Sequence, residues 1–189
     1  MRLQYFGDSY DIVKQSMLQW LSPYGPWAAH PMFTDLVTEE DARAFSTFLG
    51  VPLISDEVLT DTTDRNAYFR GRRTGQSLFL DPDTGLSVSR VPRRRLPQYL
   101  LATELVTLAN ATPEGLCMVF DQALQRGAEG AALQAKMHHL KEHGIHAFAY
   151  KSHASFIVAG ASPGLVEQAR STVLAASALP GNRLLATAG

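Results

Sequence analysis

The chain has little cysteine and no long hydrophobic run. Cys117 is its only cysteine, so no disulfide can form within the chain, and we expect a buried, unreactive thiol in a reducing cytoplasm. No stretch approaches the ~20 apolar residues that a membrane-spanning helix requires, and the first residues lack the basic region and apolar stretch of a signal peptide. The sequence therefore predicts a cytoplasmic protein with no membrane partner.

Several nucleotide-binding and catalytic motifs are also missing. The sequence contains no Gly-x-Gly-x-x-Gly, no P-loop, no Gly-x-Ser-x-Gly and no Cys-x-x-Cys. These absences disfavour dinucleotide oxidoreductases, P-loop NTPases, α/β-hydrolases and zinc ribbons. We therefore predict that neither NAD nor ATP is a cofactor.

Neither sign of charge dominates the chain as a whole. The 17 basic and 18 acidic residues leave a formal net charge of −1, which by itself favours neither nucleic acid nor membrane. The 189 residues, 46% of them hydrophobic, suit one soluble globular domain and are too few for two ordinary ones. Charge therefore indicates a binding partner only where it is concentrated in one segment. Nothing in the sequence indicates the oligomeric state.

Helical and strand patterns alternate along the chain. Helical spacing and capping residues predict helices over 8–21, 38–50, 98–110, 128–143 and 162–179. Short apolar runs predict strands over 27–33, 51–54, 77–80, 116–120, 145–150 and 154–159. The last two strands are separated by only three residues, which permits only an antiparallel hairpin. The fold prediction is a single α/β domain over 1–189, a mostly parallel, Rossmann-like three-layer sheet with a C-terminal antiparallel hairpin at its edge.

The segment from Ser77 to Gly85 organises the predicted site. It reads S-L-F-L-D-P-D-T-G, so Asp81 and Asp83 follow a buried strand, as Asp121 follows the strand over 116–120. Because the carboxyl ends of parallel strands meet at one edge of a sheet, we expect these carboxylates to gather there. Clustered carboxylates call for a hard cation such as Mg²⁺ or Mn²⁺. The predicted metal ligands are Asp8, Asp81, Asp83 and Asp121. The alternative is that Asp-Pro-Asp-Thr-Gly is simply a turn, since these residues are common turn formers.

Two residues are candidates for proton transfer. Lys14 lies near Asp8 and Asp11 on the first turns of the first predicted helix, so an ammonium and a carboxylate can point into the same crevice. Asp8 is equally well explained as the helix N-cap. His153 lies in the turn between the last two strands, where it can act as a general acid or base if that turn faces the crevice. The four histidines between positions 138 and 146 have no His-Glu-x-x-His order and are interpreted as exposed helix residues.

Arginines are concentrated in the middle of the chain. Eight of the 17 basic residues fall between positions 65 and 95, a window with only two acids. They flank the acidic strand end on both sides and can steer a phosphate-bearing ligand such as nucleic acid towards it. The predicted substrate-binding residues are Arg70, Arg72, Arg73, Arg93, Arg94 and Arg95. The alternatives are a solvated surface and an interface for a protein partner.

These motifs together resemble a family of small, functionally uncharacterised bacterial and phage-associated proteins. The resemblance rests on an early Gly-Asp-x(5)-Lys, here Gly7, Asp8 and Lys14, and on a central Phe-Leu-Asp-Pro-Asp-x-Gly. It extends to a helix that carries a glutamate, Glu104, and to a Ser-His pair before the last strand. On this resemblance Glu104 joins Lys14 and His153 as a predicted catalytic residue.

More remotely, the Leu-Asp-Pro element is similar to that of three-Cys-motif partner proteins, which resemble Rossmann-like methyltransferases. No glycine-rich loop follows an early strand in this chain, so binding of S-adenosylmethionine is disfavoured. We predict a metal-dependent hydrolase or nuclease that acts on a phosphate-bearing substrate. The alternatives are a degenerate methyltransferase and a non-catalytic module that binds an acidic partner through its arginines.

Overall fold

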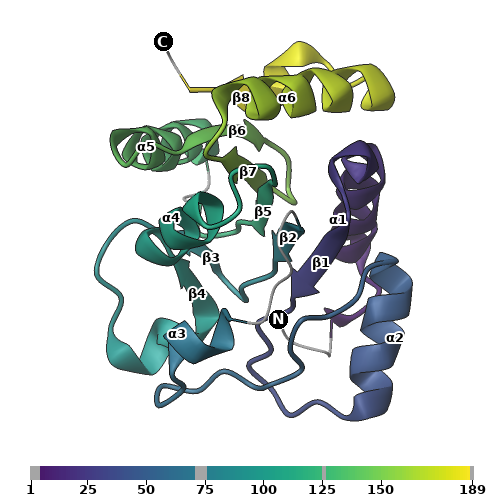
Figure 1. Ribbon diagram of the computed structural model, residues 1–189, viewed down its shortest axis with the longest axis vertical. Coiled ribbons are helices and arrows are strands. Elements are labelled where there is room, and N and C mark those ends of the chain that lie inside the picture. The colour runs from purple at the N-terminus through teal and green to yellow at the C-terminus, as the bar shows by residue number, and fades with distance from the viewer. Residues whose placement is uncertain (1–4, 71–75, 125–126, 188–189) are drawn as a thin grey trace.

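A six-stranded mixed sheet forms the centre of the molecule (Figure 1). The computed structural model describes residues 5–70, 76–124 and 127–187. In their order across the sheet, the strands are β1 (Trp27–His30), β2 (Ser77–Leu80), β5 (Cys117–Phe120), β7 (Phe156–Gly160), β6 (His146–Tyr150) and β8 (Leu184–Ala186).

Only one half of this sheet is parallel. The pairs β1–β2 and β2–β5 are parallel, whereas β5–β7, β7–β6 and β6–β8 are antiparallel. The α/β class is confirmed, but the prediction of a mostly parallel sheet is wrong. The short connection over 151–155 makes β6 and β7 antiparallel. The sheet is mixed because β7 rather than β6 pairs with β5 and because β8 adds a further antiparallel pair. β7 turns back beside β5, and β8 rather than the β6–β7 pair forms the edge of the sheet.

Helices cover both faces of the sheet. On one face α1 (Ser9–Trp20), α2 (Glu39–Leu49) and α6 (Pro163–Ser177) pack in a core that includes Phe79 and Met118. On the other face α4 (Ala102–Asn110) and α5 (Glu129–Glu142) pack in a core that includes Leu80 and Val119. Successive residues of a strand point to opposite faces, so β2 and β5 separate the two cores. Every helix among the described residues is too short or too polar to traverse a bilayer.

Short elements occupy the segments between these helices and strands. β3 (Gly85–Ser87) and β4 (Tyr99–Leu101) pair in parallel as a separate two-stranded sheet. The remaining elements are α3 (Arg65–Tyr68), η2 (Ser22–Tyr24), η3 (Arg93–Gln98) and η4 (Gly181–Arg183). The helix predicted over 98–110 therefore begins only at Ala102, because the preceding three residues form β4.

The strand predicted over 51–54 is wrong. Its place beside β1 is taken by one isolated bridge between Ala29 and Leu53. The Ala29 N–H donates to Pro52 O, and the Ile54 N–H donates to Ala29 O, both at 2.9 Å. A proline has no N–H to donate to a ladder, so the pairing does not extend into a strand.

Candidate active site at the carboxyl end of β2

A pocket of about 260 Å³ lies where β2 and β5 end and α1 begins. We call it the acidic pocket, since its charged lining residues are Asp8, Asp11, Lys14, Asp81 and Asp83. Four carboxylates and one ammonium give it a formal charge of −3 when all five groups are ionised. Aromatic rings of Tyr5, Tyr10 and Phe120 complete much of its wall.

Lys14 is at the centre of the acidic pocket. Its Nζ donates to Asp11 Oδ1 and to Asp81 Oδ2, each at 2.8 Å, and lies 4.5 Å from the centroid of the Phe120 ring. Asp11 and Lys14 face the same side of α1 because residues three apart are neighbours on a helix. All three charged side chains are buried. Lys14 thus joins the first helix to the end of the central strand.

The start of α1 fixes the two helical carboxylates. Asp8 caps the helix, and its Oδ1 accepts hydrogen bonds from the backbone N–H groups of Tyr10, at 2.8 Å, and Asp11, at 3.2 Å. Asp11 Oδ2 accepts from the Gly7 N–H at 2.8 Å. The N-cap interpretation of Asp8 is therefore correct, and Asp8 also lines the pocket. One carboxylate serves the fold and the candidate site together.

The pKa values in this cluster are shifted by burial and by the charges. Burial lowers the pKa of Lys14, but Asp81 and Asp11 more than offset it, so the pKa is raised above its ordinary value. Burial raises the pKa of Asp81, and Lys14 offsets part of that shift. Lys14 therefore stays protonated at neutral pH. It provides a fixed positive charge and is a poor general base.

Asp83 and His153 lie at the margin of the acidic pocket. Asp83 is half-buried and lines the opening. His153 is exposed in the connection between β6 and β7, and its ring centroid is 5.3 Å from that of Tyr10. The structure thus brings Asp8, Lys14, Asp81 and Asp83 together in one pocket and places His153 next to its Tyr10 wall.

Asp121 forms a separate ion pair. Lys136 Nζ donates to both of its carboxylate oxygens, at 2.7 and 2.9 Å. Asp121 Oδ1 also accepts from the N–H groups of Leu86, at 3.2 Å, and Ala123, at 3.1 Å. Burial raises the pKa of Asp121, and Lys136 offsets part of that shift. These contacts join β5, β3 and α5, so Asp121 is placed to hold the fold together.

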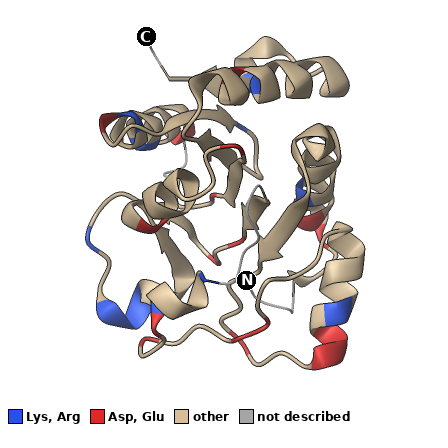
Figure 2. Ribbon diagram, viewed as in Figure 1, with Lys and Arg blue, Asp and Glu red and all other residues tan. Residues whose placement is uncertain are grey.

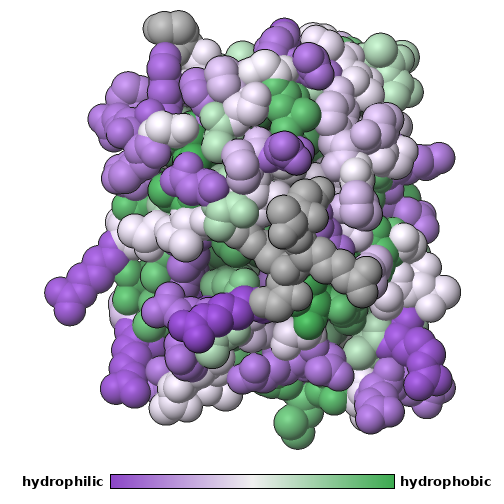
Figure 3. Space-filling view, viewed as in Figure 1, coloured by the Kyte–Doolittle hydropathy of each residue, from purple (hydrophilic) through white to green (hydrophobic). Residues whose placement is uncertain are grey.

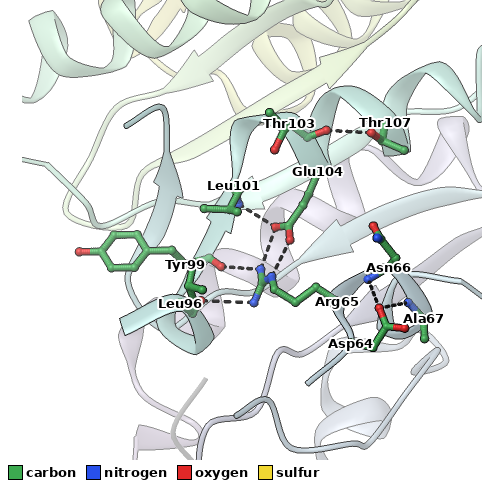
Figure 4. A network of polar contacts seen from close by, with 10 residues as sticks. All are labelled: Asp64, Arg65, Asn66, Ala67, Leu96, Tyr99, Leu101, Thr103, Glu104 and Thr107. Atoms are coloured by element: carbon green, nitrogen blue, oxygen red, sulfur yellow. Dashed lines mark hydrogen bonds and ion pairs between the residues drawn. The ribbon is translucent and has the colours of Figure 1, made fainter. Parts of the chain in front are cut away.

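Glu104 belongs to another network, centred on its ion pair with Arg65 (Figure 4). Its carboxylate accepts from Arg65 Nε at 2.5 Å and from Arg65 Nη2 at 2.7 Å. It also accepts from the Leu101 N–H at 2.8 Å, at the start of α4. Arg65 donates further to Tyr99 O at 2.8 Å and to Leu96 O at 3.2 Å. This network connects α3, η3, β4 and α4, and it lines a second pocket of about 530 Å³.

The arginines predicted to bind substrate fall into three groups. Arg70 lines the second pocket. Arg93, Arg94 and Arg95 are exposed on η3, where Figure 2 shows a concentration of positive charge. Arg72 and Arg73 lie outside the described residues. The structure therefore places the exposed arginines on η3, beside β3 and β4.

Two residues that contact Lys14 in the acidic pocket are not among the predicted site residues, namely Asp11 and Phe120. Asp11 was only a neighbour of Lys14 in that interpretation, yet it binds Lys14 as closely as Asp81 does. Its spacing of three residues from Lys14 is the signal that could have identified it. Phe120 gives no such signal, because its contact with Lys14 depends on the alignment of β5 with β2.

Among the described residues, no group of three His, Cys, Asp or Glu side chains is arranged to hold a metal ion. Asp11 and Asp81 are engaged by Lys14. Asp8 and Asp83 are the half-buried carboxylates at the opening. They are therefore the pair that a cation entering from solvent meets first.

No family model matches this chain, and searches of curated proteins and of solved structures find no match either. The functional argument therefore rests on the geometry of the site.

Proposed function

We propose that the acidic pocket is the active site of a metal-dependent hydrolase that acts on a phosphate-bearing substrate, with nucleic acid as the substrate class. The observation that carries this proposal is the grouping of Asp8, Asp81 and Asp83 around one buried lysine at the end of β2. A pocket with a formal charge of −3 attracts cations and repels phosphates. A phosphate-bearing substrate must therefore enter together with a divalent cation.

The location of the pocket supports the same proposal. We propose that β1, β2 and β5, with the helices on both faces, form a Rossmann-like half of the sheet. In open α/β sheets, ligands bind in the crevice outside the carboxyl ends of the parallel strands. The acidic pocket lies at that end of β2 and β5.

The carboxylates at the opening suit Mg²⁺ or Mn²⁺. Mg²⁺ usually keeps several waters and binds through one or two carboxylates together with substrate phosphates. Asp8 and Asp83 can supply these carboxylates, so a cluster of three protein ligands is not required. When bound, such a cation neutralises phosphate charge and lowers the pKa of a coordinated water.

The remaining residues have distinct roles in this proposal. Lys14 keeps its proton and holds Asp81 in position, since both contacts of its Nζ are to carboxylates. His153 is the group that exchanges a proton, because its imidazole lies beside Tyr10 at the margin of the pocket and imidazole is the side chain most often used as a general acid or base. It accepts the proton of the attacking water as the new P–O bond forms, and the bond to the leaving oxygen breaks. The leaving oxygen then takes a proton from His153 or from solvent.

The test is cleavage of end-labelled single- and double-stranded oligonucleotides in Mg²⁺ or Mn²⁺ by wild type, Asp83→Asn and Asp35→Asn. Asp83 is half-buried and is not among the carboxylates that bind Lys14. Circular dichroism of Asp83→Asn checks that the variant is folded before cleavage is compared. We expect wild type to cleave, Asp83→Asn to lose cleavage, and Asp35→Asn, at an exposed carboxylate in the loop before α2, to behave as wild type.

Calorimetry with Mn²⁺ alone provides a second readout. We expect binding to wild type that weakens in Asp83→Asn and is unchanged in Asp35→Asn. Absence of cleavage by wild type under all these conditions, or equal cleavage by Asp83→Asn, contradicts the proposed function.

A further inference from the structure

A third pocket has an excess of positive charge and lies next to the acidic pocket along the chain. It has a volume of about 330 Å³ and is formed by β3, the loop that follows it, η3 and the start of β4. We call it the basic pocket, since its charged lining residues are Arg90, Arg95 and Lys136. Among the described residues that line it, none is a carboxylate. The space-filling view shows hydrophilic side chains that project from the left margin, over the loop before η3 (Figure 3).

Two of these three cations are available to a ligand. Lys136 is buried and engaged by Asp121, so its charge is already compensated. Arg95 and Arg90 are exposed. The Arg95 Nη2 donates to the Tyr99 hydroxyl at 2.7 Å, and its Cζ lies 5.3 Å from the centroid of the Tyr99 ring. This contact holds the guanidinium against the wall of the pocket without neutralising it, and a guanidinium matches the oxygens of a phosphate.

The two pockets share one wall. Gln122 lines the acidic pocket, and its neighbour Ala123 lines the basic pocket. Likewise, Asp83 lines the acidic pocket, and Leu86, three residues further along the chain, lines the basic pocket. The Gln122 N–H donates to Thr84 O at 3.0 Å, which joins the two segments of the wall. Three residues of extended chain span at most about 10 Å, so one ligand can reach from the acidic pocket into the basic one.

We propose that a single nucleic-acid strand lies across this wall, with the scissile phosphate in the acidic pocket and a neighbouring phosphate at Arg90 and Arg95. This inference rests on the proposed function and specifies its substrate: a phosphodiester polymer and not a phosphomonoester. A phosphomonoester has one phosphate and can occupy only one of the pockets. Each pocket has about the volume of a small-molecule site, which suits single nucleotides of an unpaired strand.

Fluorescence anisotropy with a labelled single-stranded oligonucleotide tests binding at the basic pocket independently of hydrolysis. The measurement is made in EDTA across a series of salt concentrations. Without a divalent cation the acidic pocket takes up no phosphate, so the affinity reports the basic pocket alone. We expect wild type to bind and Arg90→Gln/Arg95→Gln to bind roughly 10- to 30-fold more weakly at about 0.1 M salt. The salt slope should be lower by about 0.7, because the two arginines contact one phosphate and each phosphate contact on a single strand contributes about 0.7.

The matched control is Arg43→Gln/Lys141→Gln. It removes the same charge from exposed positions of α2 and α5 that do not line either pocket. We expect its affinity to stay within twofold of wild type. An equal loss of affinity in the two double variants, or tighter binding of a duplex than of the single strand, overturns the proposal.

The outcome separates this inference from the proposed function. Cleavage of an oligonucleotide by wild type, together with unchanged binding in Arg90→Gln/Arg95→Gln, rejects the strand path and leaves the hydrolase. Binding that depends on Arg90 and Arg95, without cleavage in Mg²⁺ or Mn²⁺, rejects the hydrolase. If both proposals are correct, Arg90→Gln/Arg95→Gln raises the KM for an oligonucleotide and leaves unchanged the KM for a small phosphodiester that has a single phosphate.

Discussion

Lys14 Nζ and Asp81 Oδ2 are 2.8 Å apart although 67 positions of sequence separate the two residues. The contact joins the first helix to the end of the central strand, and Asp11 completes it from the other side at the same distance. Both carboxylates and the ammonium are buried. The ion pairs thus hold α1 against the carboxyl end of β2, and the candidate active site lies where these two elements meet.

Removal of the ammonium should destabilise the protein strongly. Lys14→Met leaves Asp11 and Asp81 buried without their shared cation, and the loss of one partner of a buried ion pair costs about 3–5 kcal/mol. Urea denaturation monitored by circular dichroism measures this loss. The triple variant Lys14→Met/Asp11→Asn/Asp81→Asn should recover part of the stability, because no buried charge is then left unpaired. Equal stability of Lys14→Met and wild type would show that the ion pairs do not form.

The same cluster predicts a loss of stability at alkaline pH. The pKa of Lys14 is raised above its ordinary value of 10.5 in the folded state. Its contribution is therefore fully present below pH 10.5 and is lost as the pH rises through the raised value. Urea midpoints of wild type and Lys14→Arg between pH 9 and about 12 test this, since an arginine stays charged over that range.

Lys14→Arg should lose less stability across this range than wild type does. The pKa of Tyr68 is also raised, chiefly by burial. It contributes an alkaline loss to both proteins, so only the difference between them reports on Lys14. Parallel pH curves for the two proteins would contradict the prediction.

Gly85→Ala should destabilise the protein, because Gly85 packs closely against Asp121. Gly85 has φ +133°, and a Cβ at this position would overlap Asp121 Oδ1 and lie 3.0 Å from Ala123 N. Both the strained backbone and the displaced carboxylate lower the free energy of unfolding, by about 2 kcal/mol or more together. Gly164→Ala is the control, because a Cβ there meets no atom within 4 Å in α6. It should be neutral or stabilising by up to about 1 kcal/mol. The two thermal unfolding curves give the comparison directly.

Glu104→Gln distinguishes a structural glutamate from a catalytic one. Its carboxylate is engaged by Arg65 and by the start of α4, so we expect a loss of about 1–3 kcal/mol of stability. Cleavage by the folded protein, measured well below its melting temperature, should remain within twofold of wild type. A large loss of cleavage with unchanged stability would show instead that Glu104 is catalytic, as the sequence predicts.

The local parts of the structure could be predicted from the sequence, because their causes are local. Asp8 at the start of α1 and Thr38 with Asp41 at the start of α2 are capping residues that act within one turn. Asp81 and Asp83 follow a short apolar strand bounded by turn residues, which is sufficient to place them at a sheet end. The division of the chain into helices and strands follows from such signals.

The features that were missed depend on the arrangement of distant elements. β7 lies between β5 and β6, and no local pattern states which side of a strand the next one will occupy. The same arrangement decides that Asp121 faces Lys136 of α5 rather than the acidic pocket. β8, a three-residue strand in an alanine-rich tail, is positioned by its pairing with β6, by the hydrogen bond from Gln134 of α5 to Ala186 O and by the burial of Leu184. The strand order and the partner of Asp121 are set by the packing of elements that are distant in sequence. No local sequence pattern therefore predicts them.

The position of β7 also has a consequence for synthesis on the ribosome. β5 is complete at Phe120, but the strand that covers its second edge ends at Gly160. For the time that these forty residues take to emerge, the apolar strand Cys117–Phe120 presents unpaired backbone groups. Exposed apolar edges of this kind recruit strands from other chains. A nascent chain that stalls within α5 is therefore the form of this protein most prone to aggregate.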